Sequence, residues 1–519
     1  METFAELELR EPTLVQSGPR LLYARVLGLS FLAGVWFWAA FIRGRGGETF
    51  FQISAILGAT LLIAFASALL LWVLRSKFML GRAESSRAVA FSLNGILLLL
   101  VFFPEYLLGK PPMLARSFVL ATTAVLLCGA YLFISLRSTR SVPRFEKPVV
   151  SPAVILLAVC TVYFFLISTV TLLKLHAFAY VGQDIAYFTQ CLYTTLHGHL
   201  FYSNMYHDLL YSRPVSSDFA GHNQLVLFLF LPFYALHKAA STLLIVRNIT
   251  VVLCAWPVYL ISRRTLSPWL SLAATVAFLL VPAVLYQNVY DFAPLSAAGL
   301  PLLFAFYFSL EGKFRPFVVA LLLTLIVRED LVFVAFGLGL LALWQRRPPR
   351  WSVFPCAMAL VWTFLSWGII FPYFLHGSTS AVDSCFSYMG SAPGQMVRYI
   401  LAHPRALLSQ HDLVYLKQLV DFSGGVLFLP SPAWLISAPY IAINLLAEGG
   451  GCNTAMIYRH YSMIPTVILF VSFLLAADKI TASMRKRGND PSVVHAGLVF
   501  FVLAAAVTSL MFVTGADQV

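Results

Sequence analysis

Ionisable side chains gather in particular segments of a chain that is otherwise apolar. Ten of the 11 histidines fall within residues 176–237 and 376–460, and only His495 lies elsewhere. Carboxylates and arginines accompany them, and these residue types suit proton transfer and the binding of phosphate or a cation. A purely structural membrane protein has no need to collect titratable groups in this way. The sequence therefore predicts a reactive or binding site.

Asp184 is the first candidate for chemistry. A carboxylate here could act as a general base or hold a metal ion. It stands at the start of the stretch Asp184–Leu196, in which four apolar residues recur at helical spacing, and this pattern predicts an amphipathic helix on the membrane surface. The four are Ile185, Phe188, Leu192 and Leu196. The alternative role for Asp184 is an N-cap of that helix.

Asp291 is the second acidic candidate, at the predicted outer turn after an apolar stretch. A second carboxylate near Asp184 could share the proton transfer or the cation. The alternative is a cap for the span that we expect to begin near Pro294.

The triplet Arg328, Glu329 and Asp330 interrupts the apolar stretch Phe317–Trp344. As one helix, this stretch would be about 42 Å long, well over the ~30 Å of a hydrocarbon core. Basic residues flank both of its ends, so one straight span would put one basic cluster outside. We predict a hairpin whose outer turn carries the triplet into a solvated pocket with Asp184 and Asp291. The alternative is a self-neutralised cluster that only pins two helices.

Arg459 and His460 precede a predicted span at its outer end. The guanidinium fork of Arg459, like that of Arg328, fits phosphate oxygens, although a snorkelling interfacial pair is the alternative. A further polar group could bind a divalent metal, but its spacing matches no ligand motif and a polar surface loop is the alternative. This group consists of His197, His199, His207, Asp208, Asp218 and His222.

The elements that position these residues are transmembrane helices. The chain is 60% hydrophobic and 11% charged, with a mean hydropathy of +0.83, which excludes an ordinary soluble domain. Apolar runs predict about 14 or 15 spans on a ~20-residue criterion. The plainest runs are Leu21–Ile42, Phe51–Leu74, Val89–Leu108, Ser117–Leu136, Val150–Leu173, Leu243–Ile261, Leu270–Leu285, Leu295–Leu310, Val353–Phe374, Met456–Ala476 and Val493–Val513.

Three regions follow from these runs. Residues 1–149 hold four spans, residues 150–375 hold the predicted core with an outer loop at 174–242, and residues 376–519 hold a second outer loop and the last spans. Within the first outer loop, Leu225–Leu236 is too short to span and predicts a re-entrant or interfacial segment. More than half of the 35 Lys and Arg fall in short loops that we assign to the cytoplasm. This assignment places the N-terminus in the cytoplasm. It also explains the net charge of +13 by basic loops retained on the cytoplasmic side, rather than by nucleic-acid binding.

The seven cysteines follow no metal-binding pattern. Cys128, Cys160, Cys254 and Cys356 lie in predicted spans and are typical of small apolar residues there. Cys385 and Cys452 lie in outer segments and are candidates for a disulfide.

The ordered motifs resemble those of GT-C glycosyltransferases, such as the aminoarabinose and protein-mannosyl transferases. The closest likeness is to an uncharacterised family of prokaryotic predicted membrane proteins within that superfamily, over about residues 150–476. Its motifs correspond here to Asp184…Phe188…Gln190, Asp291-Phe292-Ala293-Pro294, Arg328-Glu329-Asp330 and His460-Tyr461-Ser462, and His222 also falls within the likeness. Ala293 replaces a His of the family pattern, and Arg328 replaces a Lys.

The resemblance implies a GT-C-like, inverting transferase in the plasma (inner) membrane of a prokaryote, with its active face outside. The donor would be a polyprenyl-phosphate sugar and the acceptor a hydroxyl of a lipid, glycan or protein, with membrane lipids as further partners. Asp184 and Asp291 would be catalytic, and a divalent cation could bind at Asp184, Asp291 or His222. The substrate- or phosphate-binding set would be Gln190, His222, Arg328, Glu329, Asp330, Arg459, His460 and Tyr461.

Two other classes of function fit a polytopic chain. A transporter of a small or lipid-linked substrate would place ionisable groups near the bilayer midplane, often at repeated positions. The sequence shows no internal repeat, and its charges gather toward one face. A non-catalytic envelope scaffold would use the second outer loop, at His376–Asp412, as a partner surface.

Overall fold

The computed structural model describes most of the chain between Ser151 and Lys486. The described residues are 151–180, 183–205, 215–377, 385–390, 393–403, 410–422, 428–447, 452 and 454–486. The chain divides into two compact units, Met1–Pro143 and Arg144–Val519, and the described residues belong to the second. The four spans predicted within residues 1–149, and the one at Val493–Val513, lie outside them. Every regular element in the described ranges is helical, so the all-α prediction is confirmed.

Four helical segments in the described residues are long and apolar enough to cross a bilayer. They are Pro152–His176 (α5), Ala240–Ser262, Arg350–Leu375 and His460–Ser483. The second joins α8 (Ala240–Leu253) and α9 (Ala255–Ser262), and the third joins α15 (Arg350–Thr363), a π-helical segment (Phe364–Ile370) and α16 (Phe371–Leu375). The fourth joins a 3₁₀ turn (His460–Ser462) and α21 (Met463–Lys486). All four match predicted spans.

A fifth span is broken. Helices α10 (Pro268–Leu280) and α11 (Pro282–Val289) meet at an angle of 53°. Pro282 opens α11, and because proline has no N–H the hydrogen-bond ladder cannot run through this point. The sequence predicted a straight span at Leu270–Leu285. The bend, together with α12 (Gly299–Leu310), brings the turn that carries Asp291 into the interior, where that side chain is buried.

The stretch Phe317–Trp344 forms two helices rather than one. Helix α13 (Phe314–Leu325) and helix α14 (Val332–Trp344) are separated by a turn with a short 3₁₀ segment at Glu329–Leu331. Arg347, after α14, donates to the Ser309 carbonyl at 2.9 Å, so both basic ends meet at one side. The arms are only about 18–20 Å long at 1.5 Å per residue, which is shorter than the ~30 Å of a hydrocarbon core.

The first outer loop folds into short helices that pack on the spans. Helix α6 (Gln183–Thr195) lies against α7 (Leu227–Leu236) and α8. Its apolar residues Ile185, Phe188 and Leu192 are buried, and the Phe188 ring meets the Phe292 ring edge-on. We predicted that this apolar face would rest on lipid, but it packs against protein because aromatic rings from the neighbouring turn cover it.

The second outer region is tied to the bundle by a disulfide. Cys385 and Cys452 are bonded, with their Cα atoms 5.6 Å apart and a sequence separation of 67. The candidate pairing from the sequence is therefore confirmed. Around it lie five short helices: Ser387–Met389, α18 (Pro393–Ala402), α19 (Gln410–Phe422), Pro432–Ser437 and α20 (Ala438–Leu446).

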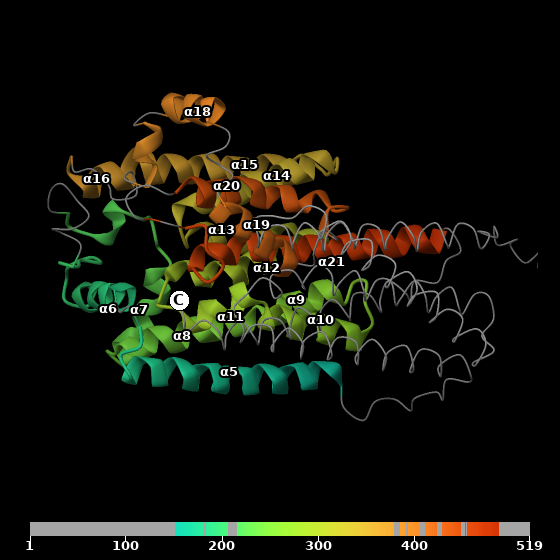
Figure 1. Ribbon diagram of the computed structural model, residues 1–519, viewed down its shortest axis with the longest axis horizontal. Helices are drawn as coiled ribbons and strands as arrows, with labels where there is room; N and C mark the ends of the chain where they lie inside the picture. The colour runs from blue at the N-terminus through green and yellow to red at the C-terminus, as the bar shows by residue number, and fades with distance from the viewer. Residues whose placement is uncertain are drawn as a thin grey trace, which may run out of the picture. The chain divides into compact units, whose positions relative to one another are not determined.

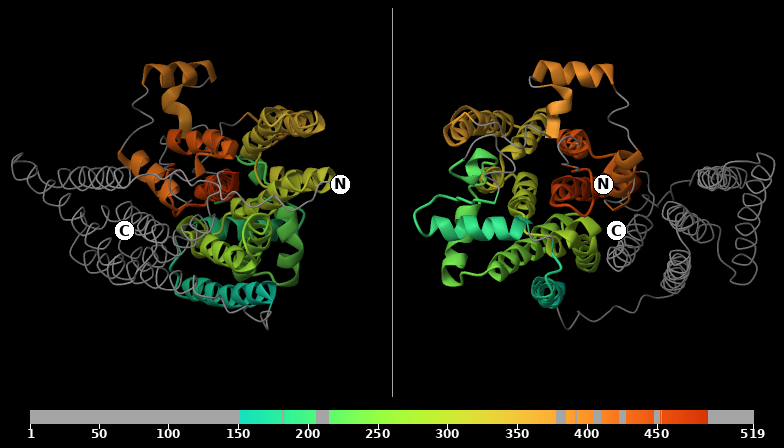
Figure 2. Two further views of the ribbon diagram at one scale, coloured as in Figure 1. Left: turned by 90° about the vertical axis from the view of Figure 1, so that its right-hand side faces the viewer. Right: turned by 60° about the vertical axis from the view of Figure 1, so that its left-hand side comes forward.

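The long helices run side by side and give this unit two chemically different ends. Figure 1 shows α5, α9, α10, α15 and α21 along the horizontal axis, with α6, α7 and α16 at the left, and Figure 2 shows the same helices from two other directions. At the other end Arg264 forms an ion pair with Glu311, and Arg350 stacks over Phe314. The basic turns predicted to share one side of the membrane therefore meet at one end.

Candidate functional site

Asp291 links two segments that are far apart in the sequence. One oxygen of its carboxylate, Oδ1, accepts hydrogen bonds from the backbone N–H groups of Ile185 at 3.1 Å and Phe292 at 2.8 Å. The Ile185 N–H belongs to the first turn of α6, where backbone donors have no partner within the helix. Asp291 therefore caps α6 from a distance. The cap considered from the sequence was for the span near Pro294, so the capped helix is a different one.

Asp184 lies in the first turn of α6 and is partly exposed. It stands inside the helix rather than before it, so it is not the N-cap that the sequence offered as the alternative. Because Ile185 follows it directly, covalent geometry keeps the Asp184 carboxylate within about 10 Å of the Asp291 oxygen. The negative charge of Asp184 also favours this position near the positive end of the helix dipole.

Arg247 in α8 holds the turn that carries Asp291. The sequence analysis did not identify this residue. This arginine of α8 is fully buried, and it donates to the carbonyls of Tyr290 at 2.9 Å and Asp291 at 3.1 Å, and also to that of Asn288. Lys174 donates to the Val289 carbonyl at 3.0 Å. A signal existed, because an ionisable residue inside a span is a functional-site candidate by default.

Glu329 has both carboxylate oxygens engaged. One lies 2.7 Å from His222 Nδ1, and the other accepts from the Asn223 N–H at 2.9 Å. Burial lowers the pKa of His222, but the charge and hydrogen bond of Glu329 more than offset this and raise it overall. Burial raises the pKa of Glu329, while His222 and Arg328 outweigh that effect and lower it. These shifts favour the imidazolium–carboxylate form of the pair, which connects the first outer loop to the charged turn.

Arg328 is bound to its own turn and to α20. Its guanidinium forms a two-pronged pair with Asp330, donates to the Tyr440 hydroxyl at 2.6 Å and lies over the Tyr461 ring at 5.2 Å. Burial lowers the pKa of Arg328, but Asp330 and Tyr440 raise it well above its usual value. These contacts support the pinning role that the sequence left open, and they occupy much of the phosphate-binding fork predicted for this residue.

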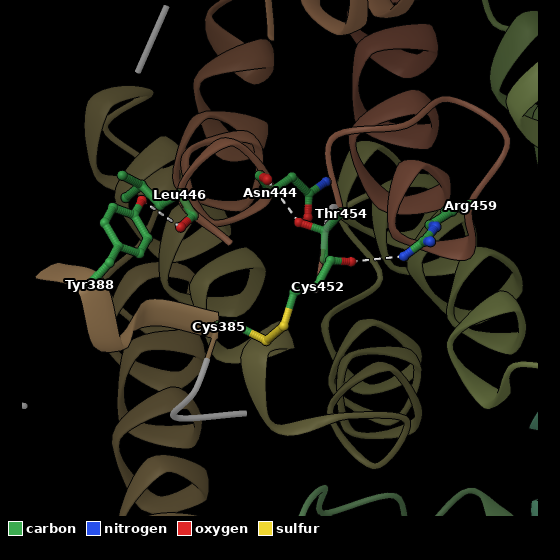
Figure 3. The surroundings of a disulfide bond; sticks show 7 residues. All are labelled: Cys385, Tyr388, Asn444, Leu446, Cys452, Thr454 and Arg459. Carbon is green, nitrogen blue, oxygen red and sulfur yellow. Dashed lines mark hydrogen bonds between the residues drawn. A yellow bond between two sulfur atoms is a disulfide. The ribbon is translucent and has the colours of Figure 1, made fainter. Parts of the chain in front are cut away.

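The guanidinium of Arg459 has fewer hydrogen-bond partners than that of Arg328 in the described residues. Its Nη1 donates to the Cys452 carbonyl at 2.7 Å (Figure 3), while its Nε has no acceptor in the described residues. It makes no ion pair with any carboxylate in those residues. An arginine whose N–H groups are not satisfied within the protein can donate them to an oxyanion. Of the two predicted phosphate-binding arginines, Arg459 is thus the one with donors to offer.

Tyr290 and Tyr461 lie near both the candidate acids and the candidate arginines. Burial raises the pKa of Tyr290, and the positive charge of Arg459 opposes this while Asp184 and Asp291 add to it. The charges of Arg328, Asp184, Arg459 and Asp330 act on the Tyr461 hydroxyl. The Arg328 guanidinium lies over the Tyr461 ring, and the Tyr290 ring lies near that of His460. Candidate residues from three regions of the sequence therefore lie close together, while the solvated pocket predicted for them stays a prediction.

His460 completes this group. Its ring lies over that of Tyr461, with centroids 4.0 Å apart, and 6.5 Å from that of Tyr290. The His460 Nδ1 is buried and has no partner in the described residues. His460 Nδ1 and Arg459 Nε, in neighbouring residues, share this property.

The remaining predicted residues lie elsewhere. Gln190 bonds to Asn204 and Ser203 and so braces the first outer loop rather than the acid–arginine cluster. His197 and His199 are exposed, and His207 and Asp208 lie outside the described residues. Asp218 is buried beneath Tyr187, whose hydroxyl donates to it at 2.7 Å. No group of three side chains suited to a metal occurs among the described residues.

Comparison with protein-family models places the chain among known sequences. Residues 171–516 match the model described as Predicted membrane protein (DUF2079). The chain belongs to this family. The matched region contains every residue of the candidate site, and residues 1–149 lie outside it. A search of curated proteins finds no match. The DUF2079 description supports a membrane assignment and names no activity.

Proposed function

We propose that this DUF2079 protein is a membrane glycosyltransferase that moves a sugar from a polyprenyl-phosphate donor to a hydroxyl group outside the cytoplasm. The observation that carries the proposal is a geometric one. Asp291 caps the helix that carries Asp184, and the ring of Tyr290, the residue before Asp291, lies 6.5 Å from that of His460, the residue after Arg459. A transferase of this kind needs a base for the acceptor and a cation for the departing phosphate. The proposal also draws on the resemblance of the site motifs to those of GT-C enzymes.

The side of the membrane follows from two opposed features. The Cys385–Cys452 disulfide lies next to Arg459, and disulfides persist in oxidising compartments outside the cytoplasm. The Arg264 and Arg347 turns meet at the other end, as cytoplasmic basic loops do. These features support a site that faces outward and receives its polyprenyl-phosphate donor from the membrane.

The chemistry can be assigned to the residues present. Asp184 takes the proton from the acceptor hydroxyl, and the oxygen attacks the anomeric carbon of the sugar as the bond from that carbon to the phosphate oxygen breaks. The phosphate leaves with the bonding electron pair, and Arg459 donates hydrogen bonds to it, with the Arg328 charge nearby. A single displacement inverts the anomeric configuration.

Asp291 is better suited to position Asp184 than to replace it as the base. Its Oδ1 already accepts two backbone hydrogen bonds, which fix the start of α6. The described residues bring no third metal ligand to Asp184 and Asp291. These residues thus do not form the ligand set of a cation site, and the proposed mechanism contains no metal-dependent step.

A transporter would need a charged group exposed along a path through the spans. Arg247 is an intramembrane charge, but it is fully buried and bound to backbone carbonyls, which is the pattern of a structural anchor.

The proposed transferase is tested by incubating the purified protein with a synthetic short-chain polyprenyl-phosphate sugar and a membrane extract as acceptor. Release of polyprenyl phosphate with a new glycosidic linkage supports it. Intact donor after incubation with an extract from a strain carrying the gene contradicts it.

A further inference from the structure

Arg459 lies at the end of a segment that begins at the disulfide. We call the chain from Cys452 to Arg459 the strap. The strap leads directly into the 3₁₀ turn His460–Ser462, which carries two further site residues. Any displacement of the strap therefore moves Arg459, His460 and Tyr461 together relative to Asp184.

The strap is tied at its beginning by contacts from two sides (Figure 3). Thr454 donates through its hydroxyl to the Asn444 carbonyl at 2.7 Å. Near Cys385, the Tyr388 hydroxyl donates to the Leu446 carbonyl at 2.8 Å. The disulfide closes this arrangement covalently, because it joins the Cys385 segment to the first residue of the strap.

The orientation of Arg459 depends on the same residue. Its guanidinium donates to the carbonyl of Cys452, the residue whose side chain forms the disulfide. Arg328 is held by the carboxylate of Asp330, whereas Arg459 has no ion pair within the described residues that would fix it otherwise. The Cys385–Cys452 bond thus anchors the residue whose carbonyl accepts a hydrogen bond from the Arg459 guanidinium.

We infer that the Cys385–Cys452 disulfide is a positioning element for phosphate binding, because it fixes the Cys452 carbonyl that orients Arg459. The inference rests on the proposed function, since it assigns the phosphate to the donor lipid. It makes donor binding dependent on the redox state of the outer face. Loss of the bond leaves the site residues in the chain but releases the Cys452 carbonyl that holds the Arg459 guanidinium.

Reduction by a dithiol breaks the S–S bond and adds two electrons and two protons, which gives two thiols on the protein and a disulfide on the reductant. Because oxidation reverses this step, one preparation can be compared in both states. Positioning is separable from overall folding, since reduction can be applied to protein that is already folded in detergent and its thermal midpoint can be followed.

The test measures binding of farnesyl phosphate, a short polyprenyl phosphate, to the full-length protein in detergent. Farnesol controls for apolar contacts, and inorganic phosphate and phosphatidylglycerol nanodiscs separate free phosphate and bulk lipid headgroups from the polyprenyl ligand. The variants are Arg459→Ala, Cys385→Ser with Cys452→Ser, and all three changes together. Cys160→Ser is the matched control, because Cys160 is a free cysteine in α5.

We expect Arg459→Ala to raise the Kd for farnesyl phosphate about 10- to 100-fold, as for a lost charge-assisted hydrogen bond. Removal or reduction of the disulfide should raise it about 3- to 10-fold and should add nothing in the Arg459→Ala background. Reoxidation should restore the affinity. Equal affinities in the two redox states, or additive losses in the triple variant, would overturn this inference alone. Failure of the wild-type protein to prefer farnesyl phosphate over farnesol would overturn the proposed function and this inference together.

Discussion

The backbone N–H of Ile185 donates to the carboxylate of Asp291 over 3.1 Å, across 106 residues of sequence. This contact fixes the start of α6 on the turn after α11, and it holds Asp184 beside Asp291. Arg247 supports the same turn through its backbone carbonyls. The base proposed for transfer is therefore placed by a carboxylate and a buried arginine that need not touch the substrate.

Asp184→Asn should abolish transfer while leaving farnesyl phosphate binding within about threefold of wild type. Asparagine keeps the size of aspartate but cannot take the proton, and loss of a general base typically costs about 10²–10⁴ in rate. Turnover and Kd are measured on the same preparation, with the exposed neighbour Gln183→Ala as the control. Full turnover in Asp184→Asn would remove this residue from the mechanism.

Arg247→Ala should destabilise the protein by about 3–5 kcal/mol, because it leaves several buried carbonyls without a donor. Arg247→Lys should recover only part of the loss, since an ammonium group cannot reproduce the guanidinium fork. Thermal unfolding in detergent measures both, and Arg315→Ala is the control because Arg315 is exposed. A thermal unfolding midpoint for Arg247→Ala equal to that of the wild type would show that this arginine does not stabilise the turn.

Asp218 should make the fold less stable as the pH rises from about 4 to 6. Burial raises the pKa of this carboxyl to about 6, and the Tyr187 hydrogen bond and the His222 charge only partly oppose this. The folded protein then keeps a proton that the unfolded chain has already lost, so the penalty for ionisation develops between the two pKa values and persists above the higher one.

Asp218→Asn should remove this pH dependence, because the amide cannot ionise but still accepts from Tyr187. The difference in stability between the variant and the wild type should grow by roughly 3 kcal/mol from pH 4 to pH 7. Thermal midpoints at four or five pH values measure it, with the exposed Asp478→Asn as the charge-removal control. Parallel pH profiles for Asp218→Asn and wild type would contradict the assignment.

The topology should read cytoplasmic at the basic turns and extracytoplasmic at the first outer loop. A reporter fused after Arg347 should be active on the cytoplasmic side, and one inserted between Tyr202 and Asp218 on the outer side. The reason is the clustering of the basic turns at the end away from the disulfide. A cytoplasmic signal from the Tyr202–Asp218 insertion would end the argument for a donor bound at the outer face.

Much of the fold was predictable because membrane spans have a strong local signal. The hydrophobic runs located α5, α15 and α21, and the two basic flanks of Phe317–Trp344 predicted its hairpin. The bend at Pro282 was missed because a run of apolar residues has the same hydropathy whether it is straight or broken. The protein surface under α6 was missed because an amphipathic pattern does not distinguish lipid from aromatic side chains.

The site was predictable by residue type but not by partner. The order of the motifs identified Asp184, Asp291 and the charged triplet, whereas the pairing of Glu329 with His222 and of Arg328 with Tyr440 depends on contacts between distant segments. Sequence reasoning gave Arg328 and Arg459 the same role. Only the three-dimensional arrangement shows that Arg328 is engaged by Asp330 and Tyr440 while Arg459 keeps free donors. Arg247 was missed because it is a single charge inside an apolar stretch that carries no motif.

The central claim, that a polyprenyl-phosphate lipid binds at this site, is tested most directly by mass spectrometry of the lipids that copurify with the protein. Wild-type protein should be enriched in polyprenyl phosphate or its glycosylated form relative to the surrounding membrane, and Arg459→Ala should lose that enrichment while keeping its bulk phospholipids. The matched control is Arg315→Ala, an exposed arginine away from the site. Lipids from the wild-type protein in the same proportions as the membrane, or equal enrichment in Arg459→Ala, would contradict the account.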